Sequence, residues 1–120
     1  MATDLTRRHP SRHLFADGFM LTDREVDWFQ HQYAATADRT DPRLSPLLAD
    51  PGPTPATVWT AGFDPLRDEG EAYAHRLNAT LHREPDLVHG YLSFYPLSRR
   101  FRTAALAVAA EIRATLAKPA

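Results

Sequence analysis

Thr60-Ala61-Gly62-Phe63-Asp64-Pro65-Leu66-Arg67-Asp68-Glu69-Gly70 is the stretch that decides the fold of this 120-residue chain. It follows directly on a short apolar and β-branched run, residues 56–61, which is typical of a buried strand. Asp64 before Pro65 is a favourable helix start, because Asp caps a first turn and Pro fits the first helical position. We therefore predict a strand over 56–61 and a helix from Asp64 to about Ala79.

The residues that follow extend this pattern into an α/β unit. Thr80 to Arg83 is predicted as a second short strand that ends at Pro85-Asp86, and apolar residues with helical spacing predict a C-terminal helix over about 101–117. Strand, helix and strand in this order indicate two parallel strands with flanking helices. Functional side chains of such sheets gather at the C-terminal ends of the strands, which places Asp64 and His89 at one edge.

The N-terminal part of the chain is less regular. Thr22 followed by Glu25 is a capping box, and it predicts a helix to about Tyr33. Residues 1–20 are expected to be irregular, with Pro10 breaking any helix, and residues 35–54 are a connecting segment rich in Asp, Pro and Arg. Two aromatic side chains of the predicted helix are expected to pack into the core: Trp28 and Phe29.

Composition limits the classes of function that are open to the chain. Its length suits one small domain, and a hydrophobic content of 43% with 24% charged residues fits a globular protein. The net charge of −1 gives no basic surface for nucleic acid. The absence of cysteine excludes disulfides, and no apolar run approaches the roughly 20 residues of a membrane span. No apolar leader is visible, so the expected location is cytoplasmic.

Two segments resemble a known family, the bacterial carboxylesterases similar to hormone-sensitive lipase, which have the α/β-hydrolase fold. Residues 60–74 resemble the acid-loop motif of that family almost without change, and Val88-His89-Gly90-Tyr91 resembles its histidine loop. The resemblance implies that Asp64 is the acid of a catalytic triad and His89 its general base. The order is acid first and histidine last, as in this fold. The reaction implied is hydrolysis of a small acyl ester through an acyl-enzyme intermediate.

The resemblance also predicts the architecture and its extent. The expected fold is the C-terminal βαβα part of an α/β-hydrolase, preceded by a helical segment. We expect one partial domain over 1–120, in which 1–54 is the irregular and helical segment and 55–120 is the acid-loop and histidine-loop unit. The family's Gly-x-Ser-x-Gly elbow and His-Gly-Gly oxyanion segment are absent. The chain alone is therefore expected to lack catalytic competence, which leaves its status as an enzyme open.

Other interpretations remain open at this point. The chain can be a non-catalytic fragment or an interaction module that forms a homodimer or docks through an open sheet edge. It can also be half of a split enzyme that a complementing chain completes.

Asp64 can be an ordinary helix cap and His89 a plain loop histidine, while Arg67 and Asp68 are expected to form a structural pair. His9 and His13 lack a carboxylate partner in the sequence pattern, so no metal and no cofactor are expected.

Overall fold

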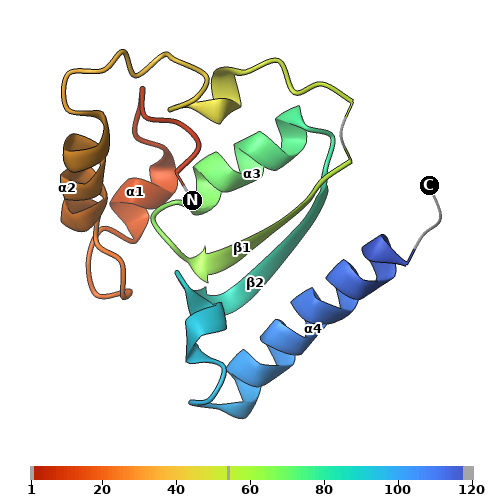
Figure 1. Ribbon diagram of the computed structural model, residues 1–120. Helices are drawn as coiled ribbons and strands as arrows, with labels where there is room; N and C mark the ends of the chain where they lie inside the picture. Colours follow the sequence, from red (N-terminus) through yellow and green to blue (C-terminus); the bar gives the residue numbers. More distant parts are fainter. Residues whose placement is uncertain (1, 54, 118–120) are drawn as a thin grey trace. The chain divides into compact units, whose positions relative to one another are not determined.

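The computed structural model describes residues 2–53 and 55–117, with the order of elements drawn in Figure 1. The elements are α1 (Pro10–Leu14), α2 (Asp23–Ala34), the 3-10 helix η1 (Pro46–Leu48), β1 (Thr57–Phe63), α3 (Arg67–Arg76), β2 (Thr80–Val88), the 3-10 helix η2 (Tyr91–Phe94) and α4 (Arg99–Leu116). The chain divides after His89 into two compact units. The first unit holds α1 to β2, and the second holds η2 and α4, which contact each other.

β1 and β2 form a two-stranded parallel sheet, as the sequence predicts. The register runs evenly from Thr57 opposite Thr80 to Ala61 opposite Glu84 and then jumps to Phe63 opposite Val88. The extra residues of β2 at this step include Pro85, so the strand continues to Val88. The predicted end of this strand at Pro85-Asp86 is wrong, because a proline is tolerated at a bulge where the ladder is interrupted.

Gly62 explains how the register jump is accommodated. A Cβ atom built on this glycine would lie 2.0 Å from the carbonyl oxygen of Pro85 and 2.5 Å from its carbonyl carbon. No side chain can occupy that space, because both atoms belong to the backbone of the neighbouring strand. Glycine therefore allows β1 and β2 to approach closely just before both strands end.

In the first unit α3 is the helix that packs on the sheet, and further helical segments pack on α3. The helix α3 packs against β1, and both α1 and η1 contact α3 (Figure 1). The capping box predicted for α2 is present, with the Thr22 hydroxyl and the Glu25 carboxylate satisfying each other's backbone amides. The predicted helix of the second unit is confirmed as α4. The expected absence of helix in residues 1–20 is wrong, because Pro10 occupies the first turn of α1, where it costs no hydrogen bond.

The apolar core of the first unit is small, with one or two residues from each of α2, η1, β1, α3 and β2 and with Leu5 and Leu66 from the connecting segments. It contains Leu5, Val26, Ala34, Leu47, Ala61, Leu66, Ala74 and Leu87. On α2 the buried face consists of Val26, Gln30 and Ala34. Trp28 and Phe29 are 56% and 57% exposed, so the expectation that they pack into the core is wrong. Helical spacing alone did not decide which of two partly apolar faces is covered.

Candidate active site

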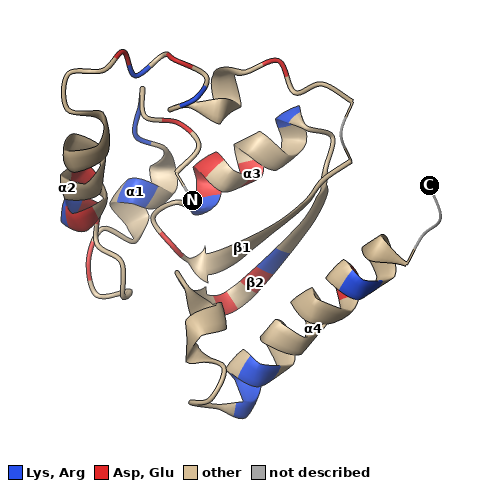
Figure 2. Cartoon of the chain, viewed as in Figure 1, with Lys and Arg blue, Asp and Glu red and all other residues tan. Residues whose placement is uncertain are grey.

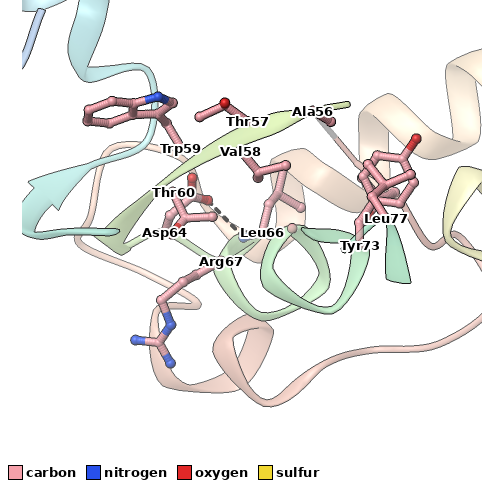
Figure 3. A pocket seen from close by; sticks show the side chains of 12 residues that line it. Ala56, Thr57, Val58, Trp59, Thr60, Asp64, Leu66, Arg67, Tyr73 and Leu77 are labelled. Atoms are coloured by element: carbon pink, nitrogen blue, oxygen red, sulfur yellow. Dashed lines mark hydrogen bonds between the residues drawn. The ribbon is translucent and has the colours of Figure 1, made fainter. Parts of the chain in front are cut away.

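Asp64 is the first residue after β1, and both its carboxylate and its backbone carbonyl accept hydrogen bonds from the residues that follow. Oδ1 accepts a hydrogen bond from the Leu66 amide at 2.8 Å (Figure 3), and the backbone carbonyl of Asp64 accepts one from the Arg67 amide at 3.0 Å. The residue is only 8% exposed. The helix α3 begins at Arg67 with Leu66 in the cap position, so the prediction that Asp64 is the helix cap is wrong. Its carboxylate forms the turn before the helix instead.

His89 follows β2 directly and lies beside that carboxylate. Its Nδ1 atom is 2.8 Å from Oδ2 of Asp64. The register places Phe63 opposite Val88, so the residues that follow the two strands meet at one edge of the sheet. An ionised carboxylate only accepts, so in a neutral His89 ring this contact favours the tautomer with the proton on Nδ1 and the lone pair on Nε2. The His89 side chain is 34% exposed in the part of the chain that the structure describes.

The backbone around this pair is fixed by glycine and by a charged pair. Gly90 has a φ of 70°, a left-handed conformation that turns the chain directly after His89. Arg67 Nε contacts Asp68 Oδ1 at 2.8 Å, which confirms the predicted structural pair. Arg67 also donates from Nη1 to the carbonyl of Gly62 at 3.0 Å. The arginine thereby ties the start of α3 to the end of β1, the strand that Asp64 follows.

A polar network links the N-terminal residues to the same turn. Ser11 donates from Oγ to the Pro65 carbonyl at 2.8 Å, and its amide donates to Asp68 Oδ2 at 2.8 Å. The Asp68 amide in turn donates to the Ser11 hydroxyl at 3.1 Å. Sequence reasoning missed Ser11, because 57 residues separate it from Asp68 and no local pattern marks such a contact.

Glu69 anchors the first residues of the described chain and is itself fully buried. Its Oε1 accepts the Thr3 amide at 2.6 Å and the Asp4 amide at 3.3 Å, and the Thr3 hydroxyl donates to the Glu69 carbonyl at 2.9 Å. Burial raises the pKa of Glu69, and these amide bonds oppose the rise. For Asp4, desolvation also acts to raise the pKa, but hydrogen bonds from Thr6 and His9 outweigh it and leave the pKa lowered.

Ion pairs also join α1 to α2, and Figure 2 marks the basic and acidic positions on these two helices. Arg12 is buried and contacts Asp23, and its Nη2 lies 2.9 Å from Oδ1 of Asp27. His9, one of the two histidines with metal-like spacing, instead has Nε2 3.0 Å from Asp4 Oδ2. Within residues 2–53 and 55–117, no group of three or more His, Asp or Glu side chains is placed to hold a metal ion.

A groove lies between β1 and α3, and Asp64 is among the residues that line it. Its volume is about 420 Å³, and Figure 3 shows β1 and α3 side chains around it. The lining includes Val58, Trp59 and Thr60 of β1 and Tyr73 of α3 together with Thr3. In the part of the chain that the structure describes, β1 pairs with β2 alone. The other edge of β1 therefore keeps unpaired backbone groups next to this groove.

Two parallel strands joined by a helix, with an Asp–His pair at their ends, match one part of the α/β-hydrolase architecture. A family model of the α/β-hydrolase fold matches residues 2–93, and the chain belongs to that family. The predicted α/β fold class and the resemblance to bacterial carboxylesterases are confirmed. Within the described residues, no helix combines the length and apolar character that crossing a bilayer requires.

Several characterised proteins are similar to this chain. Carboxylic ester hydrolase LipN of Mycobacterium tuberculosis is 48% identical over 104 residues, which cover 79% of this chain and 28% of LipN. Ethyl acetate hydrolase of Pseudomonas putida is 44% identical over 78 residues, covering 62% of this chain and 24% of the hydrolase. The chain thus spans about a quarter of the length of these relatives.

Solved structures of ester hydrolases are also similar to this chain. The ester hydrolase EH1AB1 from the Lake Arreo metagenome superposes with a TM-score of 0.88 at 42% identity, over 98% of this chain and 40% of that chain. The carboxylesterase EstE1 from a metagenomic library gives a TM-score of 0.87 at 36% identity, over 98% of this chain and 43% of that chain. More than half of each of these enzymes therefore has no counterpart among the 120 residues.

Proposed function

We propose that this chain carries the acid–base half of a serine carboxylesterase site and takes its nucleophile from residues outside these 120. The observation that carries the proposal is the 2.8 Å contact between Asp64 Oδ2 and His89 Nδ1 at the ends of two parallel strands. Membership of the α/β-hydrolase-fold family and the similarity to carboxylic ester hydrolases support it. The substrate class is a small carboxylic ester, in line with the names of those relatives.

The proposed roles of the two residues are those that the family resemblance implies, and the contact between them supports these roles. His89 Nε2 takes the proton of the attacking serine and later delivers it to the leaving alcohol. Asp64 holds the ring in the tautomer with the proton on Nδ1 and stabilises the imidazolium that forms after proton transfer. The 120 residues contain no Gly-x-Ser-x-Gly elbow, so neither step proceeds until a second segment supplies the hydroxyl.

Hydrolysis of p-nitrophenyl butyrate tests the proposal. The chain alone should show no turnover above buffer, whereas a mixture with the part of LipN outside its matched region should gain esterase activity. Asp64→Ala and His89→Ala should each abolish the gain, and His13→Ala, a substitution of an exposed histidine, should retain it. Turnover by the unmixed chain that both Asp64→Ala and His89→Ala abolish would contradict the need for an outside nucleophile.

The groove beside β1 favours a second candidate, an interaction module without chemistry. An unpaired strand edge next to a groove of about 420 Å³ suits the addition of a strand from a second copy or from another chain. Sedimentation of the whole chain distinguishes the candidates, because a stable monomer with a cooperative melt would argue against such a module. The cytoplasmic location remains a prediction that cell fractionation tests.

A further inference from the structure

The start of α3 has an unusual cap. A helix leaves its first amides without partners inside the helix, and a side chain within a few residues normally accepts one of them. Here the cap residue is Leu66, which has no side-chain acceptor. The amide of Asp68, the second residue of α3, instead donates to the Ser11 hydroxyl at 3.1 Å. Ser11 thus performs the capping role from a distant part of the sequence.

This arrangement decides what the Asp64 carboxylate is free to do. Asp before Pro at a helix start ordinarily has its side chain occupied by the helix amides. In this chain one oxygen, Oδ1, accepts the Leu66 amide, and the later amide is taken by Ser11. The second oxygen, Oδ2, therefore remains for Nδ1 of His89.

Ser11 also fixes the direction in which the carboxylate points. Its hydroxyl donates to the Pro65 carbonyl, one residue after Asp64, and its amide donates to Asp68 Oδ2. The segment between these two points is held at both ends by one buried residue. Glu69 supports the same attachment, since its carboxylate receives the amides of Thr3 and Asp4.

We propose that Ser11 is a positioning residue for the acid–base pair: by capping α3 and bracketing Pro65–Asp68, it leaves Asp64 Oδ2 free and aimed at His89. The proposal rests on the proposed function, because it assigns a role within that pair. Ser11 is separate from the missing nucleophile, because its hydroxyl is fully buried in this network and faces no open surface.

The chain contains a matched control. Ser45 is also fully buried, and its hydroxyl likewise donates to a backbone carbonyl, that of Arg39, and accepts a backbone amide, that of Leu5. Ser45→Ala and Ser11→Ala therefore remove the same group with the same number of hydroxyl hydrogen bonds. Only Ser11 makes its contacts in the turn after Asp64.

The tautomer of the His89 ring is the readout, and long-range proton–nitrogen NMR correlations of the full-length chain at alkaline pH measure it. In the wild type the Nδ1-protonated form should dominate, and Asp64→Asn should remove that preference. Ser11→Ala should lower the ratio of Nδ1-protonated to Nε2-protonated ring about tenfold, the effect of losing one well-made hydrogen bond. Ser45→Ala should leave the ratio unchanged, although it costs similar stability.

A wild-type ratio in folded Ser11→Ala would overturn the proposal, as would an equal change in Ser45→Ala. If Ser11→Ala does not fold, amide exchange in the wild type decides, because a capped Asp68 amide is protected and an unprotected one would overturn the proposal. An Asp64→Asn variant that keeps the wild-type ratio would instead overturn the acid–base pair and the proposed function with it.

Discussion

Gly62→Ala should disrupt the end of the sheet and with it the acid–base pair. The new Cβ would lie 2.0 Å from the Pro85 carbonyl oxygen, whereas ordinary contact begins at 3.4 Å, so the strands must separate by more than 1 Å. No side-chain rotation can relieve this contact, because the Pro85 carbonyl group belongs to the backbone. Overpacking of a core side chain already costs about 1–3 kcal/mol, and we expect about 3 kcal/mol or more here.

Urea denaturation of the full chain, followed by circular dichroism, measures this loss in the free energy of unfolding. Gly70→Ala is the control, because its Cβ would meet only the side-chain Cγ2 atom of Thr60 at 3.3 Å. Alanine also favours a helix interior by roughly 0.5–1 kcal/mol, so this variant should stay within about 1 kcal/mol of the wild type. A Gly62→Ala protein as stable as Gly70→Ala would refute the close approach of β1 and β2.

Three further substitutions test other parts of the molecule. Thr22→Ala removes the capping box of α2 and should lower the unfolding free energy by about 1 kcal/mol in urea denaturation, whereas Thr22→Ser should restore it. Glu69→Gln mimics the protonated carboxyl. Since burial raises the pKa of Glu69 above 4.5, the wild type should lose stability relative to this variant as pH rises from about that value, and an unchanged difference between pH 4 and 8 would contradict the burial. Acrylamide should quench Trp28, which is 56% exposed, more strongly than the less exposed Trp59 when each is left as the only tryptophan.

Local patterns predicted most elements of the fold because their causes lie within a few residues. The capping box of Thr22 and Glu25 predicts α2, and the β-branched run before Gly62 predicts β1. The same locality explains the errors at Pro10 and Pro85. Pro10 is predicted to break any helix in residues 1–20 and Pro85 to end the second strand, but Pro10 occupies a first helical turn and Pro85 a bulge. Proline forbids a hydrogen bond from its own nitrogen, and the sequence does not say whether that bond is needed.

The sequence likewise predicts one part of the candidate site and misses another part. Asp64 and His89 follow from a motif and from the rule that parallel strands end at one edge, and the structure brings them to 2.8 Å. The cap of α3 does not follow from the sequence, because the acceptor that takes the Asp68 amide lies on α1. Asp64-Pro65 is a strong local signal for a helix cap, yet the Ser11 hydroxyl accepts the Asp68 amide instead. The Asp64 carboxylate accepts the Leu66 amide in the turn before the helix.

These contacts bear on why an acid and a base can be held in place within so short a chain. The turn after β1 is fixed by Arg67 on the Gly62 carbonyl and by Ser11 on the Pro65 carbonyl, and the turn after β2 is fixed by Gly90. All of these anchors lie within the 120 residues. Under the proposed function, the carboxylate and the imidazole are therefore aligned before a nucleophile arrives, and a second segment has to supply the attacking hydroxyl and the oxyanion donors. Preorganisation of this kind lowers the entropy lost on assembly, and it is the physical reason why mixing separate parts should restore hydrolysis.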